Sequence, residues 1–245
     1  MFAARTADAP DTLLLHCSLA RHEALIPLAR MARLDALMPD LLGHGRSPAW
    51  DGHDDYQTAN LAALVPLIDR PMHVVGHSFG GTIALRLAVE RPDLVNRLTL
   101  IEPVFFALAA GTPAFERHIA DFTPIAEAVA AGALTMAARL FHDAYGTGDW
   151  DALKPAMQES FAAQMPLVVA AAPAIQEDVH GLAPRLARID VPVTLVRGAL
   201  SQPVIGEIHA DLVRRIPQAR DHVIDGAGHM VPITDPKAVA PLLAR

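Results

Sequence analysis

The chain has 245 residues, a formal charge of −7 and a hydrophobic content of 52%. This length suits one large domain, or a core with an inserted lobe, and the apolar residues suffice for a substantial core. The acidic balance and the lack of a Lys/Arg cluster argue against a nucleic-acid partner, because phosphate binding requires a basic surface.

Cysteine content and apolar runs bear on the compartment. The single cysteine, Cys17, cannot form an internal disulfide, and the first thirty residues show no secretory signal pattern. The longest apolar stretches, around 104–110 and 165–175, are too short to span a bilayer. We therefore expect a cytoplasmic protein without a membrane partner.

Short apolar runs alternate with helical patterns along most of the chain, which predicts an α/β protein with a parallel sheet covered by helices on both faces. The runs are almost continuously apolar, as is typical of strands buried on both faces. The predicted strands are 12–16, 35–40, 72–76, 97–101, 193–198 and 221–225. The predicted helices are 20–33, 58–68, 80–90, 203–216 and 236–244.

The alternation stops between about residues 105 and 188. This Ala-rich block shows helical periodicity and no convincing strand. We expect a helical insertion that lies over the sheet. The predicted division is a core of 1–104 and 186–245 with an insertion of 105–185.

Residues 76–80 read GHSFG, a serine flanked by glycines in a G-x-S-x-G pattern. The pattern follows a predicted strand and begins a predicted helix. A nucleophile on such a sharp turn needs a strained backbone, and side chains at Gly76 and Gly80 would collide as the helix packs against its strand. The amides at the helix N-terminus can stabilise a developing anion. The pattern indicates that Ser78 is a nucleophile, the alternative being a glycine-rich turn without chemistry.

A nucleophilic serine requires a base, normally histidine, to remove its proton. His229 lies in a glycine-rich loop directly after the last predicted strand, and so at the same sheet edge as Ser78. His73 and His77 flank the nucleophile, but strand alternation directs their side chains elsewhere. We expect His229 to be the base and the other two histidines to pack or form hydrogen bonds.

A metal site is not expected from this sequence. The pair His22-Glu23 resembles the start of a zinc-binding HExxH helix, but Ile26 stands where the second histidine is required. No cofactor is expected either.

Four segments together carry a family resemblance. They read LLLHCSLA, PDLLGHGRS, VVGHSFGG and GAGHMVP, at 13–20, 39–47, 74–81 and 226–232. In their order and spacing the chain resembles the α/β-hydrolase-fold enzymes. The resemblance implies a mostly parallel central sheet flanked by helices, a serine nucleophile at Ser78, a histidine base at His229 and a helical cap at the insertion.

The oxyanion hole follows from the same resemblance. In this family one donor is the backbone N–H after the nucleophile, here that of Phe79. The second comes from a loop after an early strand that usually begins with His-Gly, whereas this chain has His16-Cys17-Ser18. We expect the N–H of Ser18 to be the second donor, with Cys17 as the alternative. Cys17 is not expected to be a nucleophile, because nothing places it at an activating helix terminus.

The third member of the triad is not at its usual place. Many α/β hydrolases carry an aspartate after the penultimate strand in a G-x-x-D context, where this sequence has Leu200 and Ser201. The family's other position is the end of the strand after the nucleophile helix, and Glu102 stands there. A buried carboxylate needs a partner such as histidine. We predict Glu102 as the acid, and the alternatives are a Ser-His dyad or another carboxylate: Asp178, Asp190 or Glu207.

These features predict a cofactor-independent serine hydrolase that acts on a carboxylic ester or lactone of small to medium, largely apolar character through an acyl-enzyme. Candidate substrate-binding residues are Phe105, Phe106, Phe141 and Met165, which packing within the cap would explain equally well. Arg46, in the GHGRS turn, is expected to be structural, with binding of an acidic substrate as the alternative.

Other functions remain open from the sequence alone. They are an acyltransferase or lyase on the same scaffold, and a non-catalytic ligand-binding homologue. The expected partner is a small-molecule substrate, and a homodimer is left open.

Overall fold

The computed structural model describes residues 1–244, and a seven-stranded sheet forms its centre. The strands lie in the order β1-β3-β2-β4-β5-β6-β7, and β1 is antiparallel to β3 while the other neighbours are parallel. Their bounds are β1 Ala3–Arg5, β2 Thr12–Leu15, β3 Ala36–Pro39, β4 Met72–His77, β5 Val95–Ile101, β6 Val193–Gly198 and β7 Ala219–Ile224. Strands β2 to β7 confirm the six predicted from the sequence.

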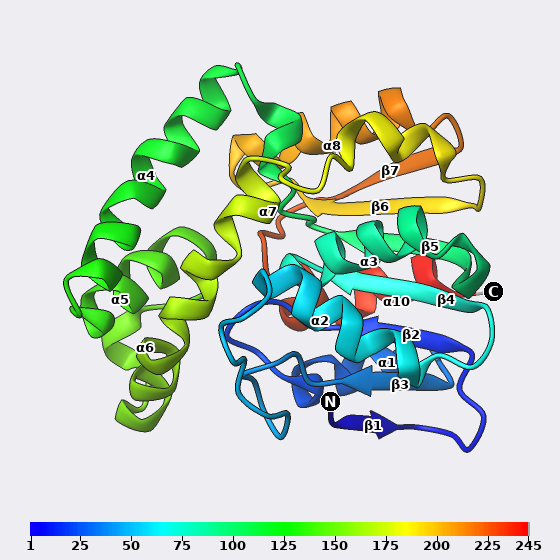
Figure 1. Cartoon of the computed structure of the whole chain (residues 1–245), viewed down its shortest axis with the longest axis horizontal. Coiled ribbons are helices and arrows are strands. Elements are labelled where there is room, and N and C mark those ends of the chain that lie inside the picture. The colour runs from blue at the N-terminus through cyan, green and yellow to red at the C-terminus, as the bar shows by residue number, and fades with distance from the viewer. Residues whose placement is uncertain (245) are drawn as a thin grey trace.

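Helices cover both faces of this sheet (Figure 1). One face carries α2 (Tyr56–Leu64), α3 (Phe79–Glu90) and α8 (Pro203–Arg215). The other carries α1 (Ile26–Met31), α9 (Val231–Thr234) and α10 (Pro236–Leu243). Short 3₁₀ helices cover His22–Leu25, Val65–Leu67, Pro92–Leu94, Phe106–Ala109, Trp150–Ala152 and Ala183–Arg188.

The predicted helix 20–33 is in fact divided. A 3₁₀ turn over His22–Leu25 precedes α1, which has a proline in its first turn. Proline lacks an N–H and clashes with the preceding turn inside a helix, so it is tolerated where a helix begins. Pro27 therefore sets the point at which the α-helix starts.

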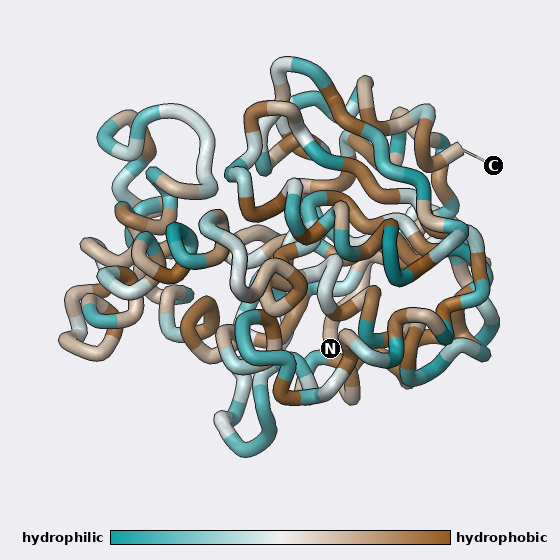
Figure 2. The backbone as a smooth tube through the Cα atoms, turned by 90° about the horizontal axis from the view of Figure 1, so that it is seen from above, coloured by the Kyte–Doolittle hydropathy of each residue, from teal (hydrophilic) through white to brown (hydrophobic). Residues whose placement is uncertain are grey.

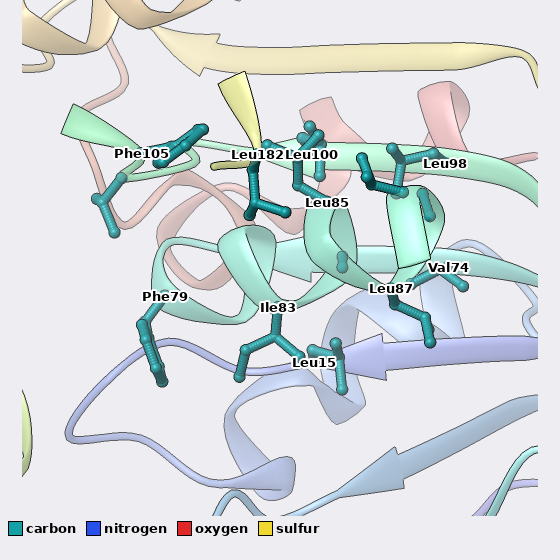
Figure 3. Close-up of a cluster of buried hydrophobic side chains, with 14 of the residues drawn as sticks. Leu15, Val74, Phe79, Ile83, Leu85, Leu87, Leu98, Leu100, Phe105 and Leu182 are labelled. Carbon is teal, nitrogen blue, oxygen red and sulfur yellow. The ribbon is translucent and has the colours of Figure 1, made fainter. Parts of the chain in front are cut away.

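The core lies on both sides of the sheet. Leu13 and Leu15 pack in the cluster that includes α2, α3 and α8, whereas Leu14 packs in the cluster with α1 and α10. This follows from the alternation of side chains along a strand. Figure 2 shows hydrophobic segments running through the sheet lobe, and Figure 3 shows Ile83 of α3 beside Leu15 of β2 in the first cluster.

The segment between β5 and β6 is helical and contains no strand, as predicted. It holds α4 (Pro113–Ala130), α5 (Leu134–Tyr145), α6 (Pro155–Ala170) and α7 (Ala172–Gln176), which we call the cap helices. In Figure 1, α4, α5 and α6 lie beyond the carboxyl ends of the parallel strands. These helices have an apolar cluster of their own around Trp150 and Met165.

Within residues 1–244, no helix combines the length and the apolar composition needed to cross a membrane.

Candidate active site

Ser78 lies on the sharp turn between β4 and α3. Its backbone has φ +54° and ψ −119°, a region that L-residues rarely adopt and that stores strain at functional sites. A Cβ at Gly76 would lie 2.4 Å from the carbonyl oxygen of Gly80, and one at Gly80 would lie 2.4 Å from that of His16. The predicted collision is therefore confirmed for Gly76, where a side chain would meet the backbone of α3. A side chain at Gly80 would instead meet the backbone at the end of β2, not that of the strand before its helix.

Three residues from different loops form one hydrogen-bonded series. Nε2 of His229 lies 3.0 Å from Oγ of Ser78, and Nδ1 of His229 lies 3.0 Å from Oε2 of Glu102. An ionised carboxylate only accepts hydrogen bonds, so Nδ1 carries the proton and Nε2 is the acceptor for the Ser78 hydroxyl. The structure thus brings together Ser78, His229 and Glu102 in the order that proton removal from serine requires.

Glu102 directly follows β5 and lies in the left-handed region, with φ +52°, and its side chain is fully buried. Its Oε1 accepts hydrogen bonds from the N–H of Gly198 and from Oγ of Ser201, both at 2.6 Å. Burial acts to raise the pKa of this carboxyl, but the hydrogen bonds from His229, Ser201 and Gly198 outweigh burial and hold the pKa below its usual range. Glu102 is therefore held as a carboxylate.

Ser201 is a site residue that sequence reasoning missed. It occupies the position where an aspartate was expected, and it donates to the glutamate that stands in for that aspartate. The sequence around Ser201 does not indicate its hydrogen bond to Glu102, because the two residues are 99 positions apart in the chain. In the part of the chain that the structure describes, the proposed alternatives form no hydrogen bond or ion pair with His229: Asp178, Asp190 and Glu207.

The two histidines beside the nucleophile form hydrogen bonds, as expected. His77 shares a hydrogen bond of 2.9 Å between its Nε2 and the carbonyl oxygen of His229, in which the ring nitrogen donates. His73 contacts Oγ1 of Thr99 at 2.9 Å. Burial lowers the pKa of both imidazoles to about 3, so both stay uncharged. His77 thereby positions the loop that carries His229.

The predicted oxyanion donors, Ser18 and Phe79, both line the pocket at Ser78. Nε2 of His16 accepts the N–H of Leu41 at 2.9 Å, so its Nδ1 is protonated and donates to the carbonyl oxygen of Cys17 at 2.7 Å. In a trans peptide the N–H points opposite to the C=O, so this bond directs the N–H of Ser18 away from His16. Within residues 1–244 neither the N–H of Ser18 nor that of Phe79 has a hydrogen-bond acceptor.

Cys17 is buried and does not line the pocket. Burial raises the pKa of its thiol to about 12, which keeps the sulfur protonated. This environment is the opposite of the one that activates a cysteine.

The cap helices close the pocket over Ser78 and His229. Phe106 and Phe141 line it, whereas Phe105 and Met165 do not. Phe105 is 1% exposed and packs in the core beside α3, and Met165 is fully buried in the cluster within the cap. Phe105 and Met165 therefore serve packing and do not contact the substrate site, because their side chains fill the interior on either side of the pocket.

The pocket has a volume of about 30 Å³. This narrow space is bordered by both Ser78 and His229.

The GHGRS turn is held together by Asp40. Its Oδ1 accepts the N–H and the Nδ1–H of His22, and its Oδ2 accepts the N–H of Arg46, each at 2.8 Å. With Glu23, His22 and Asp40 form a group whose donor atoms lie within 4.8 Å of one another and could hold a metal ion. We assign it a structural role, because these bonds fix the turn. The guanidinium of Arg46 lies 4.1 Å from the ring centre of Phe2 and outside the pocket.

A larger groove of about 460 Å³ lies at the amino ends of β2, β4 and β5, on the edge opposite Ser78. In parallel α/β sheets, ligands bind at the carboxyl ends of the strands. The cap pocket is therefore the better candidate for a site.

The nucleophile stands on a strand-turn-helix motif of a mostly parallel sheet, and a histidine joins it to a buried glutamate. This combination defines an enzyme of the α/β hydrolase class. The sequence matches the family described as alpha/beta hydrolase fold over residues 13–236. The chain belongs to this family.

Relatives and solved structures agree with this membership. The chain is 31% identical over 233 residues to esterase Rv0045c of Mycobacterium tuberculosis, a match that covers 83% of this chain and 71% of the esterase. It is 47% identical over 89 residues to lipase LipV of the same organism, which covers 35% of this chain and only 30% of the lipase. An alpha/beta hydrolase from Sphaerobacter thermophilus superposes with a TM-score of 0.75 at 22% identity, covering 99% of this chain and 94% of the other. This last likeness supports the fold alone.

Proposed function

We propose that the protein is a serine ester hydrolase that works through an acyl-enzyme on Ser78. The observation that carries the proposal is the hydrogen-bonded series from Oγ of Ser78 through His229 to Glu102. The predicted class of ester hydrolase is confirmed, since the chain belongs to the α/β hydrolase family and its relatives include a named esterase and a named lipase.

In the first half-reaction, Oγ of Ser78 attacks the carbonyl carbon of the ester while Nε2 of His229 takes the hydroxyl proton. The carbonyl electron pair moves to oxygen, and the N–H groups of Ser18 and Phe79 stabilise this oxyanion. The carboxylate of Glu102 stabilises the protonated imidazole. The intermediate then collapses, the bond to the alcohol oxygen breaks, and His229 returns its proton to that oxygen.

In the second half-reaction, water attacks the acyl group on Ser78. His229 takes a proton from the water, and the same two N–H groups hold the second oxyanion. Cleavage of the bond to Oγ gives the carboxylic acid and restores Ser78, with the proton returned by His229. No net change in the protonation of the site results.

The substrate class follows from the pocket wall. The cap contributes mainly apolar side chains, among them Phe106, Phe122, Phe141 and Ile175. Pockets of this kind bind apolar groups and use a few polar contacts to orient them. We propose a carboxylic ester or lactone of small to medium size.

A fluorophosphonate probe tests the proposal. We expect one adduct, located on Ser78 by mass spectrometry, and hydrolysis of p-nitrophenyl butyrate that the probe abolishes. The variant Ser78→Ala should show neither property. As a matched control, Ser160→Ala removes an exposed serine on α6 and should keep both.

Two outcomes would overturn the proposal. One is a folded protein that the probe does not label. The other is a variant His229→Ala with unchanged hydrolysis.

A further inference from the structure

Three polar side chains from three cap helices meet, and two of them line the pocket. His118 comes from α4, Tyr145 ends α5 and Gln176 ends α7. Nδ1 of His118 lies 2.9 Å from Oη of Tyr145, and Nε2 of Gln176 lies 3.2 Å from Nε2 of His118. We call these residues the cap triplet. His118 and Tyr145 line the pocket among otherwise apolar cap residues.

The hydrogen positions in the cap triplet follow from donor and acceptor chemistry. The amide nitrogen of Gln176 can only donate, so Nε2 of His118 must accept. A neutral imidazole then carries its proton on Nδ1, which donates to Oη of Tyr145. The surroundings favour the neutral form, because Phe106 stacks on the ring at a centroid distance of 3.6 Å and burial lowers the pKa of His118 to about 4.

The hydroxyl of Tyr145 consequently keeps its own hydrogen to donate. Among residues 1–244 it has no acceptor, since its one hydrogen-bond contact is the nitrogen that donates to it. Burial raises the pKa of Tyr145, so the hydroxyl stays protonated. A buried donor of this kind is costly unless a ligand or water supplies an oxygen.

The place of Tyr145 indicates which part of a substrate would supply this oxygen. Its ring contacts the ring of His229 edge-on, with centroids 5.2 Å apart. In the mechanism proposed above, His229 returns the proton to the leaving alcohol, so the alcohol part of the ester lies on the His229 side of Ser78. Tyr145 therefore stands next to the alcohol part.

We propose that Tyr145 is a specificity-determining residue that donates its hydroxyl hydrogen to a second oxygen in the alcohol part of the ester. The preferred substrates are then esters of alcohols that carry an ether, carbonyl or hydroxyl oxygen a few bonds from the ester oxygen. His118 and Gln176 position this donor by fixing the tautomer. The inference rests on the serine ester hydrolase function proposed above.

The experiment compares esters that differ in one atom. The butyrates of 2-methoxyethanol and 3-methoxypropan-1-ol are paired with n-butyl and n-pentyl butyrate, whose chains carry CH₂ in place of the ether oxygen. All four esters form the same butyryl-enzyme, so kcat/KM reports only the steps up to loss of the alcohol. Hydrolysis is followed by titration of the released acid.

We expect the ratio of kcat/KM for ether over alkyl ester to fall about tenfold in Tyr145→Phe for at least one pair, because one hydrogen bond to a buried donor is lost. Labelling of Ser78 by the fluorophosphonate probe and an unchanged circular dichroism spectrum show that the variant is folded and its triad intact. Most of the fall should appear in KM, because Tyr145 contacts a part of the ester that does not react.

Two other results have distinct meanings. Equal ratios in wild type and Tyr145→Phe, with n-butyl butyrate still hydrolysed, would overturn the role of Tyr145 and leave the serine mechanism standing. Failure of the wild type to hydrolyse any of the four esters or p-nitrophenyl butyrate would overturn the proposed function and this inference with it. A variant inactive on every ester would also contradict the inference, since it would assign Tyr145 a role in folding or in the reaction itself.

Discussion

The pocket has two walls, one built by the sheet and one by the cap helices, and they differ in how their polar atoms are held. On the sheet side, Glu102 receives hydrogen bonds from His229, Ser201 and the backbone of β6. On the cap side, the wall is mostly aromatic and aliphatic, and His118 and Tyr145 of the cap triplet supply its polar groups. This difference suggests that the sheet wall holds the residues that carry out the reaction, whereas the cap wall determines which substrate binds.

The largest effect should follow from the acid of the sheet wall. Glu102→Gln replaces a charged acceptor by an amide that cannot stabilise the protonated His229, and we expect turnover of p-nitrophenyl butyrate to fall at least about a hundredfold. Glu207→Gln, on the exposed side of α8, is the matched control and should keep normal kinetics. Normal kinetics in Glu102→Gln would assign the role to another group.

A second test of the acid moves the carboxylate from the end of β5 to the loop after β6. Oγ of Ser201 already lies 2.6 Å from Oε1 of Glu102, so an aspartate at 201 reaches the same region. We expect Glu102→Gln/Ser201→Asp to recover at least about tenfold of the activity that Glu102→Gln loses, measured as kcat/KM for p-nitrophenyl butyrate. Ser201→Ala in the Glu102→Gln background should recover none. Without recovery, the attachment of the carboxylate directly after β5 would itself be essential.

Buried histidines of the sheet and of the cap should both make the stability of the fold depend on pH. Burial lowers the pKa of His73 to about 3, so below its ordinary value of 6.5 the unfolded chain binds a proton that the folded chain excludes. The free energy of unfolding therefore falls as pH drops below 6.5. His16 and His77 in the sheet lobe act in the same direction with pKa values near 3, and His118 in the cap with a value near 4.

His73→Gln tests this dependence away from the active site. Between pH 7 and pH 5 the variant should lose about 1 to 2 kcal/mol less stability than the wild type, because one fewer histidine titrates only on unfolding. Urea denaturation at both pH values measures the difference, and the same comparison at pH 8 corrects for the lost contact with Thr99. Identical losses in the two proteins would mean that His73 titrates alike in both states.

The smallest effect on the reaction should come from the apolar cap wall. Phe141→Ala removes a ring from the pocket, and we expect KM for p-nitrophenyl butyrate to rise by less than about tenfold with kcat nearly unchanged. Phe161→Ala, in the cap but outside the pocket, should leave KM unaltered. A large fall in kcat for Phe141→Ala would contradict the division between the walls.

The residues of the sheet wall were predictable because the parallel strands determine where each of them lies. Each of Ser78, Glu102 and His229 follows a strand that an apolar run predicts, and the carboxyl ends of parallel strands meet at one edge. The strand β1 was not predicted, because its sequence Ala-Ala-Arg has no apolar alternation, and within residues 1–244 it pairs with β3 alone. The hydrogen bond from Ser201 to Glu102 could not be predicted from the sequence either, because a serine in a loop can bond to many different partners.

The cap wall was less predictable for a physical reason. Helical periodicity indicates which face of a helix is apolar, but not which helix that face meets. Phe106 and Phe141 line the pocket while Phe105 and Met165 fill the interior, although all four are apolar residues of the same segment. The cap triplet joins three helices across up to 58 positions, so no local pattern reveals it.

The hydrogen bond between Glu102 and the N–H of Gly198 also links activity to the order of folding events. These residues are 96 positions apart, and the whole cap lies between them in the chain. Closing so long a loop is entropically costly and tends to be slow. A molecule in which β5 and β6 have not yet paired would hold its serine and histidine without their acid. The rate at which enzyme activity returns after dilution from denaturant would then report the formation of this one contact. Backbone spectroscopy, in contrast, reports an average over the whole chain.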